Sequence, residues 1–212
     1  MPVPDAKLAI LVLASGGGTR LGGGKLLLPW RGRPLLLHTL DAASTLPADI
    51  PLLVTTGHEA PRVEEAVKAG FSPGPRPFRI LRNPDWQKGQ STSLRLGIQA
   101  IVDEFGPNKS VLVMLGDQPA VSPNTLAKLA TAHTAAHPAT APMYNDQRGN
   151  PVVLSPALFP EIMRLEGDVG ARALLKSLGD SLRTIEVDDP GVVRDIDTPE
   201  AYDALQRDQT GA

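Results

Sequence analysis

The chain alternates short apolar runs with segments of helical periodicity. Four runs rich in Ile, Leu and Val, each followed by Gly, Asn or Asp, predict buried parallel strands at residues 8–13, 51–55, 78–81 and 110–115. Apolar positions spaced three or four residues apart predict helices at 34–46, 62–69 and 91–105. This alternation predicts a three-layer, Rossmann-like α/β fold, in which helices cover both faces of a mostly parallel sheet. Ligands of such sheets bind beyond the carboxyl ends of the strands.

The second half of the chain is less regular. We expect a helix from Ser122 to about His137, strands at 140–144, 151–154 and 182–187, helical stretches up to Gly179 and a final helix from about Thr198. Between two of these strands, Asn145-Asp-Gln-Arg-Gly-Asn reads as a hairpin turn. It predicts a small β insertion that folds over one edge of the sheet and receives a second substrate.

Composition narrows the classes of function. A length of 212 residues suits one domain, and the longest apolar run, residues 8–14, is too short to span a bilayer. The first residues lack the pattern of a secretory signal, so we expect a cytoplasmic protein that contacts no membrane. The absence of cysteine excludes disulfides and thiolate catalysis. A net charge of −2 offers no general field for nucleic acid, which favours a small-molecule partner.

The first predicted strand runs into a loop dense in glycine. Its sequence is Ala14-Ser-Gly-Gly-Gly-Thr-Arg-Leu-Gly-Gly-Gly-Lys. Glycines let successive amides turn toward one anion, while Arg20 and Lys25 supply positive charge for phosphate oxygens. The spacing matches neither a Walker loop nor a dinucleotide fingerprint, since Thr19 and Leu21 stand where each requires glycine. A phosphate-binding loop of another kind is predicted.

Carboxylates follow the fourth strand and precede the last helix. Asp117, in Gly116-Asp-Gln-Pro, suits Mg²⁺, which needs only one or two carboxylates besides waters and phosphates; the alternative is that Asp117 caps the next helix. Asp195 and Asp197 share one side of an extended segment, so either one completes a metal site. The following Thr198-Pro-Glu is explained by helix capping alone.

Two further segments have both a structural and a functional interpretation. Asn83-Pro-Asp-Trp-Gln-Lys-Gly-Gln-Ser-Thr-Ser-Leu-Arg opens a helix with hydroxyl groups, which either bind an anion or act as N-caps through Ser91 or Ser93. Trp86 within it is equally compatible with the core. Gly167-Asp-Val-Gly-Ala-Arg either caps the helix that follows or binds an acceptor through Asp168 and Arg172.

Together these segments resemble the MobA-like nucleotidyltransferases that modify molybdopterin. The resemblance covers most of the chain, and its residues are Leu13-Ala-Ser-Gly-Gly-Gly-Thr-Arg-Leu-Gly, Lys25-Leu-Leu-Leu-Pro, Asn83-Pro-Asp-Trp, Ser91-Thr-Ser-Leu-Arg, Gly116-Asp-Gln-Pro, Arg148-Gly-Asn-Pro, Gly167-Asp-Val-Gly-Ala-Arg and Asp195-Ile-Asp-Thr-Pro-Glu. It implies a fold like that of nucleotide-diphospho-sugar transferases. It also divides the single domain, residues 1–212, into an NTP-binding half, 1–120, and an acceptor-binding half, 121–212.

The resemblance assigns roles to residues at the matching positions. The nucleotide-binding set is Leu13, Ala14, Ser15, Gly16, Gly17, Gly18, Thr19, Arg20, Lys25, Thr56, Gly57, Asn83, Ser93 and Asp117, of which Arg20, Lys25 and Asp117 are catalytic. The acceptor-binding set is Gln118, Pro119, Arg148, Gly149, Asn150, Asp168 and Arg172. Mg²⁺ is the implied cofactor, held by Asp117 and by Asp197, with Asp195 as the alternative second ligand.

The loop sequence points to one branch of this family. Lys25-Leu-Leu-Leu-Pro is similar to the cytidylyl branch, whereas the guanylyl branch usually carries Asp-Lys-Gly. The chain departs from the usual pattern at Ser15, where Ala is common, at Gln90-Ser-Thr-Ser, and at Asn150, where His is frequent. The expected substrates are CTP and molybdopterin or the molybdenum cofactor, with transient contact to a molybdoenzyme or its maturation chaperone.

Three alternatives stay open at this point. A guanylyltransferase would use the same acceptor with GTP. Another nucleotidyltransferase on this fold would act on a sugar phosphate or a polyol phosphate. A carrier of the molybdenum cofactor would have no catalytic metal and no reason to keep an NTP site.

Overall fold

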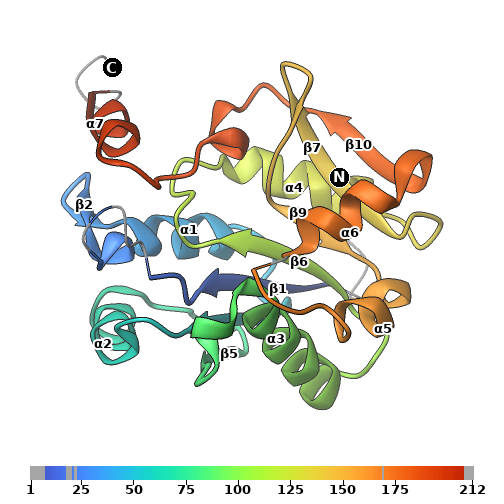
Figure 1. The fold of residues 1–212 in the computed structure, drawn as a ribbon, viewed down its shortest axis with the longest axis horizontal. Helices are drawn as coiled ribbons and strands as arrows, with labels where there is room; N and C mark the ends of the chain where they lie inside the picture. Colours follow the sequence, from blue (N-terminus) through green and yellow to red (C-terminus); the bar gives the residue numbers. More distant parts are fainter. Residues whose placement is uncertain (1–7, 18–20, 22, 169, 208–212) are drawn as a thin grey trace.

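The strands build one mixed sheet. The computed structural model describes residues 8–17, 21, 23–168 and 170–207, and these contain an eight-stranded sheet of order β10-β7-β9-β6-β1-β4-β5, with β8 paired to β7 (Figure 1). Their bounds are β1 Leu8–Ala14, β4 Leu52–Thr56, β5 Phe78–Arg82, β6 Ser110–Leu115, β7 Ala139–Tyr144, β8 Gln147–Arg148, β9 Val152–Leu154 and β10 Leu182–Glu186. Strand β9 runs antiparallel to β6 and β7, whereas β4, β1 and β6 pair in parallel, as do β5 with β4 and β10 with β7.

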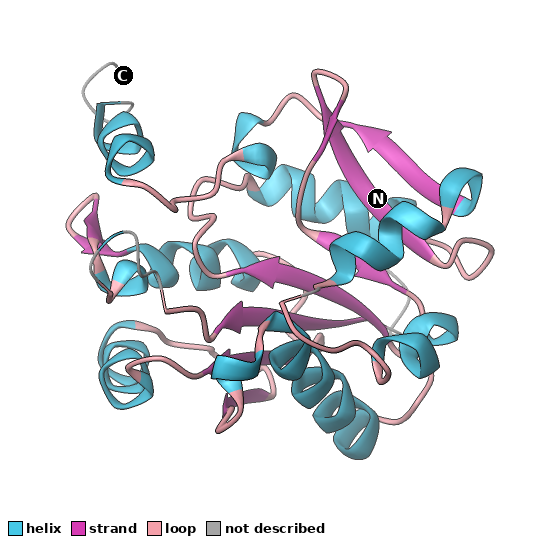
Figure 2. Ribbon diagram, viewed as in Figure 1, coloured by secondary structure: helices cyan, strands magenta, loops and turns pink. Residues whose placement is uncertain are grey.

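Helices cover both faces of this sheet (Figure 2). One face packs against α1 (Leu35–Ser44), α2 (Ala60–Gly70) and α4 (Pro123–Ala132), the other against α3 (Gln90–Phe105), α5 (Phe159–Ile162) and α6 (Ala171–Ser177). Strand β1 supplies both cores, because Ile10 and Val12 face the first set of helices while Ala9 and Leu11 face the second. The predicted three-layer α/β architecture is confirmed. Short 3₁₀ turns lie at Lys25–Leu27, Trp86–Lys88, Pro156–Leu158, Gly179–Ser181 and Pro190–Val193.

The second half differs from the prediction in two respects. Strands β7 and β9 lie within the main sheet, between β6 and β10, and not over its edge; only the hairpin partner β8 lies outside the strand order. Helix α4 ends at Ala132 instead of near His137. The chain is already extended at His133, whose ring hydrogen-bonds the hydroxyls of Thr140 (2.9 Å) and Ser110 (3.0 Å), and Pro138 disfavours helix before it.

A hairpin that the sequence reading did not predict follows the glycine-rich loop. Strands β2 (Pro29–Trp30) and β3 (Arg33–Pro34) pair antiparallel across Arg31 and Gly32, which both have positive φ (48° and 75°). Two left-handed residues in a two-residue loop match the twist of the flanking strands. This hairpin carries the chain from Lys25 into α1.

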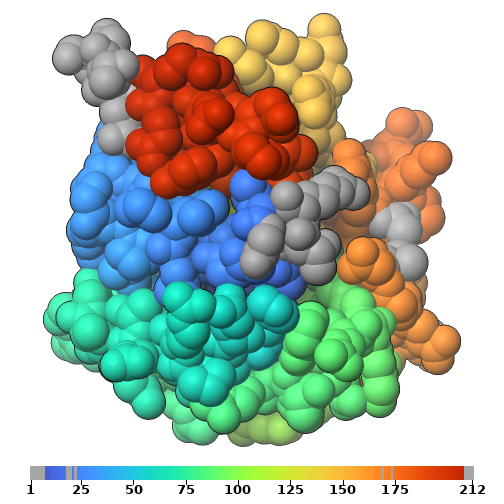
Figure 3. Space-filling model, turned by 60° about the vertical axis from the view of Figure 1, so that its left-hand side comes forward, coloured from blue at the N-terminus to red at the C-terminus, as the bar shows by residue number. Residues whose placement is uncertain are grey.

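The C-terminal helix α7 (Pro199–Arg207) packs on this hairpin. The Thr198 hydroxyl accepts a hydrogen bond from the Ala201 amide (3.2 Å), which confirms the predicted cap. The hydroxyl of Tyr202 and the side-chain amide of Gln206 both donate to the Pro29 carbonyl, at 2.6 and 2.7 Å. In Figure 3 the red C-terminal helix accordingly lies against the blue residues of the hairpin.

Among the described residues, no helix has the length and apolar character to cross a membrane.

The environment of His133 predicts a pH dependence of stability. Burial, with the charges of His137 and Arg183, lowers the pKa of His133. In the unfolded chain, His133 takes up a proton near pH 6.5, whereas in the folded protein it does so only at a lower pH. Protonation therefore favours the unfolded chain, and the free energy of unfolding falls as the pH drops below 6.5. We expect the urea midpoint of the wild type to drop between pH 7.5 and 5.5. His133→Gln should flatten this change; parallel curves for the two proteins would contradict the assignment.

Candidate active site

A cleft of about 780 Å³ opens beyond the carboxyl ends of β1 and β6. Of the predicted nucleotide-binding residues, Leu13, Ala14, Ser15, Gly16, Gly17, Lys25, Ser93 and Asp117 line it, and of the predicted acceptor-binding residues, Gln118, Arg148, Gly149, Asn150, Asp168 and Arg172 do so. Asp195 and Asp197 complete the wall. The cleft therefore lies where an open α/β sheet binds its ligands.

The centre of the cleft is an ammonium group between two carboxylates. Lys25 Nζ lies 2.5 Å from Asp117 Oδ2 and 2.5 Å from Asp197 Oδ1. The Lys25 side chain is 9% exposed, that of Asp117 17% and that of Asp197 49%. Burial lowers the pKa of Lys25, but the charges and hydrogen bonds of Asp117 and Asp197 outweigh burial and raise it above its ordinary value. The lysine is thus held in its charged form at neutral pH.

Backbone contacts fix these groups from three distant parts of the chain. The Gly116 amide donates to the Leu13 carbonyl (2.9 Å), which ties the end of β6 to β1, and the Ile196 amide donates to the Asp117 carbonyl (3.3 Å).

Helix α4 is capped by Ser122, whose hydroxyl accepts from the Asn124 amide (3.2 Å). The interpretation of Asp117 as the cap of that helix is therefore wrong.

Asp195 and Asp197 both face the cleft, as their spacing predicts, while Ile196 between them is buried. The two carboxylates have different partners. Asp195 accepts a 2.6 Å hydrogen bond from Gln118 Nε2, whereas Asp197 contacts Lys25. Burial and then the charges of Asp117 and Asp197 raise the pKa of Asp195, against the opposing effects of Gln118 and Lys25.

The carboxylate pair fits a divalent metal. Two oxygens that each lie 2.5 Å from one nitrogen are at most 5.0 Å apart, and both contact a single positive charge. Mg²⁺-sized ions bind oxygen at about 2.1 Å and keep several waters, so two carboxylates with substrate phosphates suffice. Within the described ranges, no group of three or more His, Cys, Asp or Glu side chains forms a cage for a metal. The donors thus suit a metal that is shared with a bound phosphate.

Ser15, Gly16 and Gly17 bring the start of the glycine-rich loop to the cleft. The Ser15 carbonyl accepts from the His58 amide (3.1 Å), and the Ser15 hydroxyl is buried without a hydrogen-bond partner among the described residues. Gly18, Thr19 and Arg20 lie outside the described residues.

Among the predicted site residues that the structure describes, four do not line the cleft: Thr56, Gly57, Asn83 and Pro119. Asn83 is buried behind Ser93 and joins β5 to α3, since its side-chain amide donates to the hydroxyls of Thr92 (2.8 Å) and Ser93 (2.9 Å). The Thr56 hydroxyl donates to Glu64 (2.9 Å). Gly57 leaves room for Trp86, because a Cβ there would lie 2.5 Å from Trp86 Cβ.

The loop at Gly167 and Asp168 closes the N-terminus of α3. The Gln90 amide donates to Asp168 Oδ1 (3.3 Å), and the Ser91 amide to the Gly167 carbonyl (3.3 Å). Neither Ser91 nor Ser93 caps the helix, so that interpretation is wrong. These two amides are already bonded within the protein, so neither is free to bind an anion.

The opposite wall is held by close backbone contacts. The Asn150 amide donates to the Val192 carbonyl (2.8 Å), and a Cβ on Gly149 would lie 2.4 Å from the same oxygen. Arg148 Nη2 donates to the Arg172 carbonyl at the limit of hydrogen bonding (3.5 Å). These contacts bring Arg148 and Arg172, which are 24 residues apart, to one side of the cleft.

A family comparison agrees with this geometry. The model of the MobA-like NTP transferase domain matches residues 10–182. The chain belongs to this family. It is therefore a nucleotidyltransferase, and the predicted enzyme class and family are confirmed.

Relatives within this family carry different names. The nicotine blue oxidoreductase of Paenarthrobacter nicotinovorans is 34% identical over 90% of this chain and 92% of its own length. Purine catabolism protein PucB of Bacillus subtilis is 30% identical over 92% and 94%. The molybdenum cofactor cytidylyltransferase of Escherichia coli is 25% identical over 91% and 92%. These relatives support the family, but their names do not agree on one substrate.

Solved structures share the whole fold. Rv0371c of Mycobacterium tuberculosis has a TM-score of 0.76 and 31% identity, covering 95% of this chain and 97% of that one. A structure of Rv0371c in complex with manganese has a TM-score of 0.73 and 30% identity, covering 95% and 98%. A Methanothermobacter nucleotidyl transferase has a TM-score of 0.76 and 26% identity, covering 95% and 96%.

Several cleft residues of this nucleotidyltransferase lie in segments that the sequence singled out, but had no role predicted for them individually. Gln87 and Lys88, after half-buried Trp86, line the cleft, as does Gln147 of β8. The signal for Trp86 was the Asn83-Pro-Asp-Trp segment, but the residue was equally compatible with the core. It packs edge-on against His58, with ring centroids 5.1 Å apart. No spacing rule identifies Gln147, which reaches the cleft through its pairing with β7.

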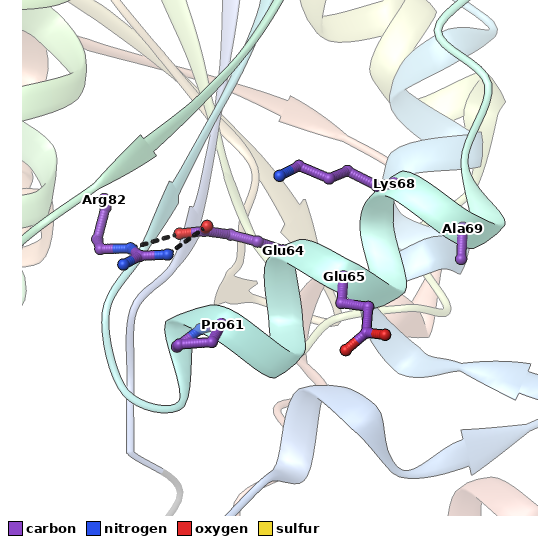
Figure 4. A pocket seen from close by; sticks show the side chains of 6 residues that line it. All are labelled: Pro61, Glu64, Glu65, Lys68, Ala69 and Arg82. Carbon is purple, nitrogen blue, oxygen red and sulfur yellow. Dashed lines mark hydrogen bonds and ion pairs between the residues drawn. The ribbon is translucent and has the colours of Figure 1, made fainter.

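A second, smaller hollow on α2 has a different character. It measures about 510 Å³ and is lined by Pro61, Glu64, Glu65, Lys68, Ala69 and Arg82 (Figure 4). Arg82 and Glu64 pair through two hydrogen bonds of 2.8 and 2.6 Å, so its charged groups satisfy one another. Of the described residues predicted to bind phosphate, Ser15, Gly16, Gly17 and Lys25 line the other cleft.

The contact between α3 and the Gly167 loop yields a test of stability. A Cβ on Gly89 would lie 2.2 Å from the Gly167 carbonyl carbon, and Gly89 also has a φ of 108°. Gly89→Ala should therefore lower the free energy of unfolding by roughly 2–4 kcal/mol, from overpacking and left-handed strain together. Gly106→Ala, at the other end of α3, is the matched control.

Gly106 also has positive φ (88°), but nothing lies within 4 Å of its Cβ position. We expect Gly106→Ala to cost only about 1–2 kcal/mol from backbone strain. Denaturant unfolding of both variants measures the difference. Equal losses would show that the close approach of Gly167 contributes nothing.

Proposed function

We propose that this nucleotidyltransferase transfers CMP from CTP to molybdopterin in an Mg²⁺-dependent reaction that releases pyrophosphate. The observation that carries the proposal is the convergence of Lys25, Asp117 and Asp197 in the cleft that begins at the glycine-rich loop. This arrangement offers a fixed positive charge and a pair of hard oxygen donors beside a phosphate-binding loop. The similarity to the Escherichia coli cytidylyltransferase supports the choice of nucleotide and acceptor.

The chemical step is an in-line displacement at phosphorus. An oxygen of the terminal phosphate of molybdopterin attacks the α-phosphorus of CTP. A new P–O bond forms as the bond to the bridging oxygen of the β-phosphate breaks, and pyrophosphate leaves with that electron pair. The second pKa of a phosphate monoester is about 6, so the nucleophile is largely ionised at neutral pH. No general base is required, which agrees with a cleft whose described lining contains no histidine.

The protein's task is then to position the phosphates and offset their charge. Lys25, kept protonated by its carboxylate neighbours, neutralises charge on the NTP phosphates. Asp117 and Asp197 would hold Mg²⁺, with Asp117 the better buried of the two. When bound, Mg²⁺ offsets charge on the transferred and leaving phosphates. Arg20 remains a predicted phosphate ligand.

The acceptor is proposed to bind on the wall built from the second half of the chain. Arg148 and Arg172 line that wall and Gln118, from the end of the first half, borders it, while Ser15, Gly16 and Gly17 at the start of the glycine-rich loop line the other wall. Residues 1–120 would then bind the NTP and residues 121–212 the acceptor. The two walls meet at Asp117 and Lys25, which is where the two phosphates must react.

The direct test is pyrophosphate release with molybdopterin, Mg²⁺ and each of the four NTPs in turn. We expect release with CTP, because the sequence after the glycine-rich loop is similar to the cytidylyl branch. Asp117→Asn should lower the rate by about 10³-fold or more, since it weakens the metal site. Release with GTP alone would make the protein a guanylyltransferase. No release with any NTP would indicate a sugar or polyol phosphate acceptor, or a carrier.

The two C-terminal carboxylates provide a matched pair of variants. Asp197 shares Lys25 with Asp117, whereas Asp195 hydrogen-bonds Gln118. Asp197→Asn should lower kcat by about 10²-fold or more, as loss of a metal ligand does, while Asp195→Asn keeps its hydrogen bond and should cost about tenfold. Steady-state kinetics over a range of Mg²⁺ concentrations distinguishes them. A larger loss in Asp195→Asn would make Asp195 the second metal ligand.

A further inference from the structure

Lys25 has two incompatible tasks in the proposed reaction. Its ammonium contacts the oxygens of Asp117 and Asp197 that are proposed to bind Mg²⁺, at 2.5 Å each. It is also the last residue of the glycine-rich loop, where the NTP phosphates are proposed to bind. One ammonium group cannot satisfy both the carboxylates and the phosphates fully.

The ammonium and a metal compete for the same pair of oxygens. A divalent ion bound between Asp117 and Asp197 would meet a positive charge that is 9% exposed and therefore poorly screened by water. Removal of the lysine charge alone would leave two carboxylates close together, which favours a cation beside them. Whether the ammonium or a metal occupies the carboxylate pair thus depends on whether Lys25 binds the carboxylates or the phosphates.

We propose that Lys25 is an internal counter-cation, which holds Asp117 and Asp197 until the NTP phosphates draw its ammonium away and free the pair for the metal. This inference rests on the proposed function, because it requires a phosphate site and a metal site in one cleft. Metal and NTP then bind with positive coupling: metal binds weakly without nucleotide, and each ligand strengthens the other.

The local structure suits such a movement. Lys25 begins a three-residue 3₁₀ turn, and Gly23 and Gly24 before it have φ of 90° and 65°. The lysine stem has four rotatable bonds, so the ammonium can change position through a change of rotamer, without movement of the backbone. Asp117 and Asp197, in contrast, are joined through the hydrogen bond from the Ile196 amide to the Asp117 carbonyl. The carboxylates stay while the cation moves.

The experiment measures Mn²⁺ binding by the full chain, followed through the electron paramagnetic resonance signal of free Mn²⁺. Lys25→Met keeps an unbranched side chain that is one atom shorter than lysine and removes its charge. Without nucleotide, we expect Lys25→Met to bind Mn²⁺ at least about tenfold more tightly than the wild type, although it should lose activity. A non-hydrolysable CTP analogue should strengthen Mn²⁺ binding in the wild type much more than in this variant.

Two further variants control for charge. Lys25→Arg keeps the positive charge and should bind Mn²⁺ as weakly as the wild type in the absence of nucleotide. Lys68→Met makes the same change of net charge on exposed α2, at the hollow of Figure 4, and should leave Mn²⁺ affinity unchanged. An equal gain in Lys68→Met would overturn the proposal, because the effect would then come from overall charge.

A measurement on the wild type covers the case in which Lys25→Met does not fold. Acylation of lysine amines, read by mass spectrometry, should be slow at Lys25 in the protein alone and faster at saturating Mn²⁺, because displacement exposes the ammonium. An unchanged rate at Lys25 would overturn the inference, as would equal Mn²⁺ affinity of folded Lys25→Met and wild type, and neither result affects the proposed function. Absence of Mn²⁺ binding by every protein, with and without the CTP analogue, would overturn both.

Discussion

The arrangement of the cleft depends on the ion pair of Lys25 with Asp117 and Asp197. Burial of an ammonium is costly unless carboxylates compensate it, and buried carboxylates need the same compensation. Residues separated by 92 and 172 positions must therefore meet within a hydrogen bond's length. The parallel sheet brings the segments of Lys25 and Asp117 together, since these follow β1 and β6, which are neighbours and both end at the cleft. The C-terminal segment must bring Asp197.

That segment is held by contacts outside the cleft. Ile196 and Leu205 are buried in a cluster with Trp30, and Tyr202 and Gln206 bond the Pro29 carbonyl, four residues after Lys25. Helix α7 thus links the hairpin after Lys25 to the segment that carries Asp197. Loss of this packing would separate the lysine from one of its two carboxylates, although neither α7 nor the hairpin lines the cleft.

The sequence predicted the parts of this arrangement that local rules govern. Asp117, the shared side of Asp195 and Asp197, and the glycine-rich loop follow from periodicity and turn chemistry. The structure brings these three carboxylates, Lys25 and the start of the loop, Ser15 to Gly17, to one cleft, while residues 18–20 and 22 of the loop lie outside the described residues. Other features depend on tertiary contacts. The framework role of Asn83 arises because Ser93 comes to lie beside it, and the capping of α3 by Asp168 joins segments 78 residues apart. No local pattern distinguishes such residues from ligand contacts.

The cleft has a largely buried part, around Lys25 and Asp117, and an exposed rim, and this difference bears on substrate choice. Relatives that share most of this chain's length are named for an oxidoreductase, a purine catabolism protein and a cytidylyltransferase, so the fold by itself does not determine the acceptor. Lys25 and Asp117, the largely buried members of the ionic centre, tolerate little change, because loss of one leaves the charge of the other uncompensated. Arg172 and Lys88, in contrast, are exposed at the cleft wall and Arg148 is partly so. Selectivity for the acceptor is therefore expected in this rim, while the phosphoryl chemistry is proposed to belong to Lys25 and its carboxylates.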